Sequence, residues 1–344
     1  TYRLVAAVST GFTLILAALL AWDYLALIQA EKIPGTFQGI WHYAFAPQAM
    51  SFMGGKITFH LATDGAGVAM CLLTALTIFT GVFASWTLQE RAKEYYALLL
   101  LLVAGVFGVF VTVDLFFFFL FYEIAVLPMY LLIGIWGTGQ KEYSAMKLTL
   151  MLLMGSALII VGFLALFVAA DKATMGGGTF NLLQLAAVAK EAFADAQFQR
   201  WVFLAFYLGF GVLAGIFPIH TWSPDGHASA PTATSMLHAG VLMKLGGFGL
   251  LRVALPLLPQ GLQDWHWLIA VVAAWNIVYG AFSALGQRDL KYVIAYSSVS
   301  HLGMVMLGLA AGGAIGSAGL PGVVTAINGA VFQMFAHGIM TACF

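Results

Sequence analysis

The sequence predicts an all-α protein, a polytopic bundle of transmembrane helices. Of its 344 residues, 62% are hydrophobic and only 8% are charged, whereas ordinary soluble domains carry about 25% charged residues. Apolar runs follow one another along the chain, and roughly 20 such residues in a helix cross the hydrocarbon core of a bilayer. So few charged residues cannot cover a soluble surface, so we expect residues 1–344 to form a single transmembrane domain.

The apolar runs predict about ten membrane crossings, separated by charged or Gly/Pro-rich joints. The expected helices cover residues 4–29, 60–86, 95–112, 114–136, 144–170, 201–218, 232–254, 265–285, 291–311 and 322–344. Residues 172–200 form the longest joint in the second half of the chain and are expected to lie outside the membrane. Within it, leucines and alanines alternate with Lys190, Glu191 and Asp195 over residues 180–198, a pattern typical of an amphipathic helix at the membrane interface.

Lysine and arginine residues of the short joints predict the orientation of the bundle. Cytoplasmic loops are enriched in these residues. If the helices cross the membrane as expected, the basic residues of the short joints all lie on one side. These residues are Arg91, Lys93, Lys141, Lys147, Arg288 and Lys291. This side is therefore expected to be cytoplasmic.

Composition excludes several classes of function. The net charge is zero and no basic, aromatic-rich block offers a phosphate-binding surface, so nucleic-acid binding is not expected. Only Cys71 and Cys343 are present, too few to hold an iron–sulfur cluster. No GxxxxGK[ST] stretch occurs, so nucleotide binding has no support. We expect no cofactor in this chain.

Two charged residues are expected at membrane depth, Glu123 in LFYEIAVLP and Lys244 in GVLMKLGG. A charged side chain at the centre of a membrane helix costs about 2.5–3.5 kcal/mol on insertion scales. Such residues usually face a partner or a wet cavity and mark an ion path. Glu123 and Lys244 are therefore candidate proton carriers, with a purely structural ion pair as the alternative.

Histidines cluster in the second half of the chain. His301 lies mid-span among serines, and His337 lies one turn after Gln333 on the same helical face. Because histidine gains and loses a proton near pH 6.5, we include both in the expected proton path. His220 and His238 are weaker candidates. Metal binding is the competing use, but His220 and His227 are seven positions apart across Pro224, unlike a compact helical ligand pair, so no metal site is expected.

A break in a helix is predicted in the segment GVLAGIFPIHTWSPDGHASAP. Small residues are followed there by Pro218, Pro224 and Pro231. Backbone groups freed by proline are tolerated at membrane depth only where protein or water satisfies them, and transporters build ion sites from such discontinuous helices. A simple proline-rich joint between two ordinary helices is the alternative.

Several of these segments together resemble one family of membrane proteins. The segments HLATDG, DLFFFFLFYEIAVLPMYLLIGIWG, FPIHTWSPDGHASAPTATSMLHAGVLMKLGGFGLLR, DLKYVIAYSSVSHLGMV and QMFAHG resemble, in order, the subunit M (chain 4) type of antiporter-like subunit of respiratory complex I, which is related to Mrp-type cation/proton antiporter subunits. The resemblance spans about residues 57–340.

The resemblance implies a fold, a set of site residues and partners. The family has fourteen helices with two inverted five-helix repeats, and this chain would begin at the second helix and stop in the eleventh. Glu123, Lys244 and His301 would be buried residues of the fifth, eighth and tenth helices, and His220 and His337 fall on family histidines. Expected partners are other membrane subunits of complex I, lipids and protons, in a bacterial inner membrane.

One residue departs from the family pattern. The family's seventh-helix lysine, which pairs with the glutamate, stands five positions before the proline of the PxHxW stretch, and this position is Leu213 here. An unpaired buried carboxylate favours its neutral form. We therefore expect Glu123 to be either neutral or paired with another cation, for which Lys244 is the nearest candidate.

Three hypotheses for the function remain at this stage. The leading one is a proton-translocating subunit of an NADH:quinone oxidoreductase whose redox chemistry lies in other subunits. The second is a subunit of a multi-subunit cation/proton antiporter or of a membrane-bound hydrogenase. The third is a structural subunit that has lost pumping, which Leu213 favours and which the retained Lys244 and His301 oppose.

Overall fold

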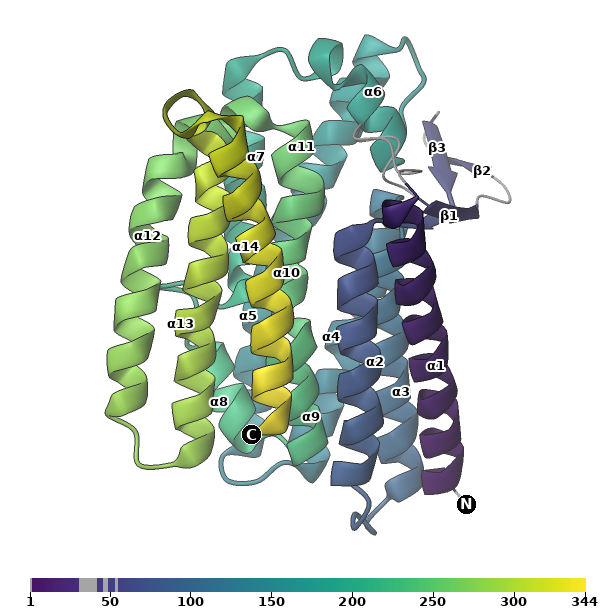
Figure 1. Ribbon diagram of the computed structural model, residues 1–344, viewed down its shortest axis with the longest axis vertical. Helices are drawn as coiled ribbons and strands as arrows, with labels where there is room; N and C mark the ends of the chain where they lie inside the picture. Colours follow the sequence, from purple (N-terminus) through teal and green to yellow (C-terminus); the bar gives the residue numbers. More distant parts are fainter. Residues whose placement is uncertain (1, 31–41, 46–48, 53–54) are drawn as a thin grey trace.

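The structure, a computed structural model, describes residues 2–30, 42–45, 49–52 and 55–344 and is a bundle of long helices (Figure 1). In this part of the chain, nine helical segments are long and apolar enough to cross a membrane. Eight of them are α1 (Tyr2–Gln29), α2 (Gly65–Ala84), α3 (Ala92–Val111), α4 (Leu115–Trp136), α5 (Lys141–Ala173), α12 (Pro259–Leu285), α13 (Leu290–Ala310) and α14 (Ile315–Cys343). The expected polytopic all-α architecture is confirmed.

The ninth segment is a helix of irregular pitch. It consists of α9 (Thr232–Leu237), a π-helical turn (His238–Leu242), α10 (Lys244–Gly249), a second π-helical turn (Leu250–Ala254) and α11 (Leu255–Leu257). Within the described residues this stretch is the most buried of the candidate spans, with 83% of its most apolar part inside the protein. Lys244 thus lies on a helix that is enclosed by other helices.

The expected crossing at 201–218 is discontinuous. Helix α7 (Ala196–Ala214) is followed by its C-cap Gly215, and after six further residues without regular helix the chain resumes as the short α8 (Trp222–Ser229). Gly215 has a φ of +68°, and a Cβ at this position would lie 2.8 Å from Met243 Cε. Both the left-handed conformation and the close contact favour glycine. α7 is less apolar than the nine other spans and does not count among them.

Short strands, which the sequence analysis did not predict, lie at one end of the bundle. β1 (His42–Phe45) pairs antiparallel with β4 (Leu61–Thr63), and β2 (Ala49–Phe52) pairs with β3 (Gly55–Thr58). The expected helix 60–86 therefore begins only at Gly65, where Asp64 caps it by accepting a bond from the Gly67 N–H. The amphipathic helix expected over 180–198 is shorter, as α6 (Leu182–Ala192), with Leu182 and Leu185 buried.

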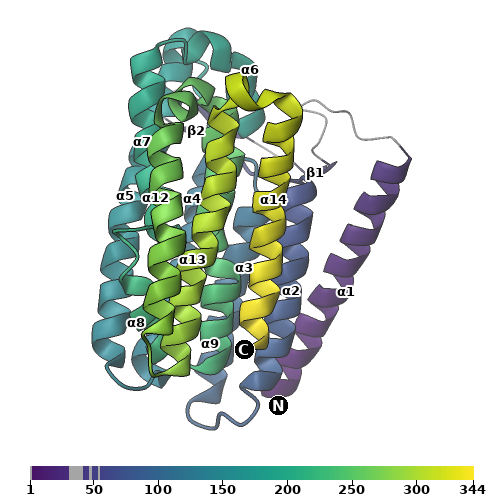
Figure 2. The same ribbon diagram turned by 60° about the vertical axis from the view of Figure 1, so that its left-hand side comes forward.

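The helices pack in sequential neighbour pairs. The most extensive pairs are α12 with α13, α3 with α4 and α5 with α7, and the connections α2–α3, α4–α5 and α12–α13 meet at one end of the bundle (Figure 1). These connections carry the lysines and arginines that predict the cytoplasmic side. At the opposite end lie α6 and the strands. Helix α1 leans away from the others toward its Gln29 end (Figure 2).

Candidate proton-transfer site

Lys244 is fully buried at the start of α10, and its ammonium group has two partners. Nζ donates to the backbone carbonyl of Ala239 and lies 2.6 Å from Nδ1 of His337 on α14. The lysine therefore meets its two requirements inside a membrane protein, polar partners and exclusion from lipid.

The π-helical turn explains why the Ala239 carbonyl is available. In a regular α-helix the N–H of residue 243 bonds the carbonyl of residue 239. Here the Met243 N–H donates instead to the carbonyl of His238, five residues back, at 3.2 Å. One carbonyl is thereby left for the lysine side chain. π-Helical turns of this kind occur frequently at functional sites, and no sequence signal predicted this one.

The polar contacts continue from Lys244 to the neighbouring helices. The rings of His337 and His301 lie 4.9 Å apart between centroids, and Gln333 Nε2 lies 2.8 Å from His301 Nδ1. The carboxamide NH₂ and the lysine ammonium are donors, so Nδ1 of each histidine accepts and both rings are neutral here. Gln333 forms its hydrogen bond with His301 on the neighbouring helix α13 and not with His337, which lies one turn away on α14 itself.

Glu123 is not part of this chain of contacts. Its Oε1 is buried without a hydrogen-bond partner among the described residues, and Ser156 on α5 lies near the carboxyl group. Leu213 is also fully buried. No ion pair joins Glu123 to Lys244 within the described residues, so the structure does not bring these two candidates together.

His238 belongs to a second cluster of rings. It stacks between Trp222 and His227, with ring centroids 5.2 Å and 4.0 Å away. His227 Nδ1 lies 3.2 Å from the hydroxyl of Ser235, whereas neither nitrogen of His238 has a partner in the described protein. His227 was not among the proton-path residues expected from the sequence, because the pattern could not show that the broken helix folds its ring against that of His238.

His220 lies apart from both clusters, beside the break between α7 and α8. Its ring packs against Phe217, Tyr279 and Tyr296. Asn276 on α12 supports the break, since its Oδ1 accepts from the Phe217 N–H at 2.8 Å and its Nδ2 donates to the Val299 carbonyl at 2.8 Å. Among the described residues, no group of three or more His, Cys, Asp or Glu side chains is placed to hold a metal ion.

Asn276 was missed by the sequence analysis, although a polar residue within the apolar span IAVVAAWNIVYG was the available signal. A fully buried amide at membrane depth requires partners. One of these partners is the backbone N–H of Phe217, which lies between α7 and α8 and therefore has no partner within a regular helix.

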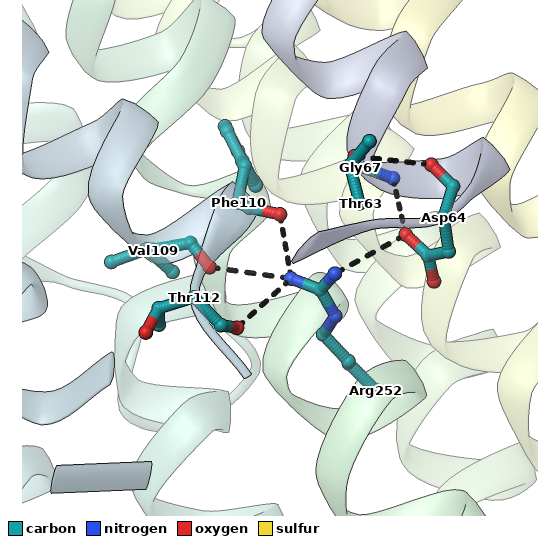
Figure 3. Close-up of polar contacts among 7 residues, drawn as sticks. All are labelled: Thr63, Asp64, Gly67, Val109, Phe110, Thr112 and Arg252. Atoms are coloured by element: carbon teal, nitrogen blue, oxygen red, sulfur yellow. Dashed lines mark hydrogen bonds and ion pairs between the residues drawn. The ribbon is translucent and has the colours of Figure 1, made fainter. Parts of the chain in front are cut away.

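A buried arginine forms a further polar cluster toward the strand-bearing end of the bundle (Figure 3). Arg252 Nη2 lies 3.4 Å from Asp64 Oδ1, and Nη1 donates to the Phe110 carbonyl at 2.6 Å. The carbonyls of Val109 and Thr112 lie 3.5 Å from the same nitrogen. These carbonyls close α3, so Arg252 binds the end of one helix and the N-cap of another.

A small cavity of about 60 Å³ lies beside Lys291, at the start of α13. Its lining includes His227, Ser235, Ala239, Lys291 and Thr341. The Ala239 carbonyl is a partner of Lys244, and the Thr341 hydroxyl donates to the His337 carbonyl at 2.8 Å. The cavity therefore extends from Lys291 to Ala239 and Thr341, two residues that hydrogen-bond Lys244 and His337, while Lys244 and His337 themselves do not line it.

Comparison with known proteins identifies the family. Residues 112–344 match the profile of the family described as NADH:quinone oxidoreductase/Mrp antiporter, TM. The chain belongs to this family. The matched region contains the Lys244–His337–His301 contacts, Glu123 and the broken helix.

Individual members of the family agree with this assignment. The chain is 39% identical to NAD(P)H-quinone oxidoreductase chain 4 3 of Picosynechococcus over 87% of its length and 52% of the relative. It is 36% identical to NADH-quinone oxidoreductase subunit M of Rhodobacter capsulatus, over 82% of the chain and 54% of the relative. The chain thus spans about half the length of these curated relatives.

Solved structures show the same fold. A chain of respiratory complex I from Thermus thermophilus superposes with a TM-score of 0.75 at 27% identity, covering 99% of this chain and 66% of that one. A chain of an archaeal membrane-bound sulfane sulfur reductase gives a TM-score of 0.74 at 21% identity, over 98% of this chain and 52% of that one, and shows the fold alone. The expected resemblance to antiporter-like subunits is confirmed.

Proposed function

We propose that the chain is a proton-translocating membrane subunit of a complex I-type NADH:quinone oxidoreductase in a bacterial inner membrane. The contact between Lys244 Nζ and His337 Nδ1 at 2.6 Å carries the proposal. The names of the relatives support the choice of enzyme complex. Other subunits supply the NADH and quinone chemistry, and neighbouring antiporter-like subunits and lipids surround the chain.

The protons enter through the cavity beside Lys291 and His227. Basic loops predict that this end is cytoplasmic, and the lining of the cavity includes Ala239, the residue whose carbonyl accepts from the lysine. The buried ring nitrogens of His238 and the Nε2 atoms of His227 and His337 have no partner in the described protein, a condition under which buried polar groups bind ordered water. Such waters carry the proton across the gaps between the rings.

The transfer itself uses groups that exchange one proton. Lys244 gives a proton from Nζ to Nδ1 of neutral His337, which leaves a neutral amine and an imidazolium ring. His337 then passes the charge toward His301, whose ring is 4.9 Å away between centroids. A neutral lysine inside the membrane no longer carries the cost of a buried charge.

His301→Ala tests the last step of this path, the transfer from His337 to His301. We expect proton uptake per NADH oxidised to fall several-fold, because the imidazole that accepts charge from His337 is removed. The measurement is proton uptake by vesicles containing the reconstituted complex, with NADH oxidation followed in parallel. Arg288→Ala, in the exposed loop between α12 and α13, is the control and should leave the ratio unchanged. Unaltered pumping in His301→Ala would rule out this segment of the path.

Glu123→Gln should change proton uptake little. Glu123 Oε1 is buried without a hydrogen-bond partner and no ion pair joins the carboxyl group to a cation among the described residues, and burial without a cationic partner favours the neutral carboxylic acid. A neutral glutamic acid and a glutamine then present similar groups at this site. If Glu123→Gln lowered uptake as strongly as the loss of Lys244, the carboxylate would switch without its lysine and the assignment of a neutral Glu123 would be wrong.

A subunit of an Mrp-type cation/proton antiporter is the second candidate, because the family description names both assemblies. The two are distinguished by the driving reaction. Proton uptake that requires NADH and quinone supports the complex I-type enzyme, and uptake driven by a sodium gradient alone supports the antiporter. If replacing Lys244 changes neither NADH-dependent nor sodium-driven proton uptake, the chain is a structural subunit.

A further inference from the structure

A charged recess lies at the end of the bundle that carries the basic loops, between the start of α1 and the start of α3. It has a volume of about 440 Å³, and its lining includes the cations Arg3, Arg91 and Lys93 with one carboxylate, Glu94. Its charge is therefore positive, since three cations face a single acid. The proton path does not use this recess.

Two of the cations are held in place by the fold. Arg3 Nη2 donates to the Leu88 carbonyl at 2.6 Å, which fixes its guanidinium against the α2–α3 connection. Arg91 adopts a left-handed conformation with a φ of +47° and lies 5.8 Å from the centre of the Trp136 ring. Arg91 also pairs with Glu94 at the exposed rim. An arginine over an interfacial tryptophan gains a cation–π contact and keeps donors directed outward.

Lys93 completes the recess and begins an exposed stripe on α3. It is exposed and has no ion-pair partner within the described part of the chain. Ala97, Leu101 and Ala104 follow it at intervals of three or four residues and are also exposed, Leu101 by 48%. Residues at this spacing share one helical face. A shallow apolar strip therefore runs into the membrane directly from the charged recess.

A charged recess that continues into an apolar strip matches one class of ligand. We propose that the recess binds the phosphate of an anionic glycerophospholipid, whose acyl chains lie along α3 over Ala97, Leu101 and Ala104. Arginine donors suit phosphate oxygens, and basic pockets at the cytoplasmic ends of transmembrane helices are known lipid headgroup sites. A free phosphate would use the recess but not the apolar strip, so the strip favours the lipid.

The site can be tested in the assembled complex with phosphatidylglycerol that carries a photoreactive group in its acyl chain. Reconstituted wild-type complex is irradiated, and cross-linked peptides of this chain are identified by mass spectrometry. We expect cross-links within residues 97–104. The double variant Arg91→Gln/Lys93→Gln should reduce them about thirtyfold, given the contribution of each basic residue at a membrane surface. Both side chains are exposed, so the variant should fold.

The controls separate the proposal from its competitors. Lys172→Gln removes a cation from a different cavity, whose lining also contains the carboxylates Glu191 and Asp195, and should leave the cross-links unchanged. A photoreactive phosphatidylcholine should label the strip weakly and equally in all variants. Equal phosphatidylglycerol labelling in wild type and double variant would overturn the proposal. So would loss of labelling on addition of millimolar inorganic phosphate, which indicates a free-anion site, or labelling that occurs only when the chain is separated from its neighbouring subunits.

Discussion

Lys244→Ala should abolish proton uptake by the reconstituted complex, or reduce it to near the background leak. The substitution removes the group that contacts both the Ala239 carbonyl and His337, and alanine has no group that can bind a proton. Lys244 is fully buried, so no solvent-exposed side chain can take over its role as proton carrier. Proton uptake and NADH oxidation are measured in the same vesicles.

Lys244→Arg distinguishes a proton carrier from a fixed charge. Arginine keeps the positive charge and the donor groups, but its guanidinium group stays protonated in proteins and does not release its proton. We therefore expect Lys244→Arg to pump as poorly as Lys244→Ala. Pumping restored by arginine would mean that the site needs only a positive charge, and the transfer from Nζ to His337 would be wrong.

Arg252→Met should give the largest loss of stability among single substitutions in the bundle. Removing one partner from a buried ion pair costs about 3–5 kcal/mol, because the remaining charge loses its partner. Here Asp64, whose side chain is 10% exposed, would lose the guanidinium, and the Phe110 carbonyl would lose a bond of 2.6 Å (Figure 3). The change is measured as the free energy of unfolding in detergent.

A second variant separates the ion pair from packing. Asp64→Asn/Arg252→Met removes both charges while asparagine remains a good N-cap for α2, so the double variant should be less destabilised than the sum of the single ones. Arg288→Met, at an exposed position, serves as the control. A loss below about 1 kcal/mol in Arg252→Met would show that the arginine does not hold the ends of α2 and α3 together.

The spans and the buried charges could be predicted from the sequence for a simple physical reason. Apolar runs of membrane length have few alternative structures, and Lys244, His301 and His337 interrupt such runs visibly. The pattern also placed Gly215 and Pro218 at a break, which the structure confirms. Strands β1, β2 and β3 were missed because their residues lie in a joint without clear alternation, and β4 was missed because its residues were included in the expected helix 60–86.

The contacts between helices could not be predicted in the same way. The periodicity of a single helix indicates which residues share a face, but not which neighbour that face meets. Gln333 and His337 were correctly placed on one face of α14, yet the partner of Gln333 is His301 on α13. Likewise, nothing in the spacing of His227 and His238 revealed their stacking at 4.0 Å.

The π-helical turn next to Lys244 ties the register of its helix to the charge of its side chain. The Ala239 carbonyl accepts the lysine ammonium because the Met243 N–H bonds His238 instead. If this turn tightened to regular α-helical pitch, the Met243 N–H would compete for the same oxygen. A neutral lysine holds that carbonyl less strongly than an ammonium group does. Loss of the proton from Lys244 therefore favours a shift of the Met243 N–H from the His238 carbonyl to the Ala239 carbonyl. Deprotonation of one side chain would in this way move the backbone along the helix axis.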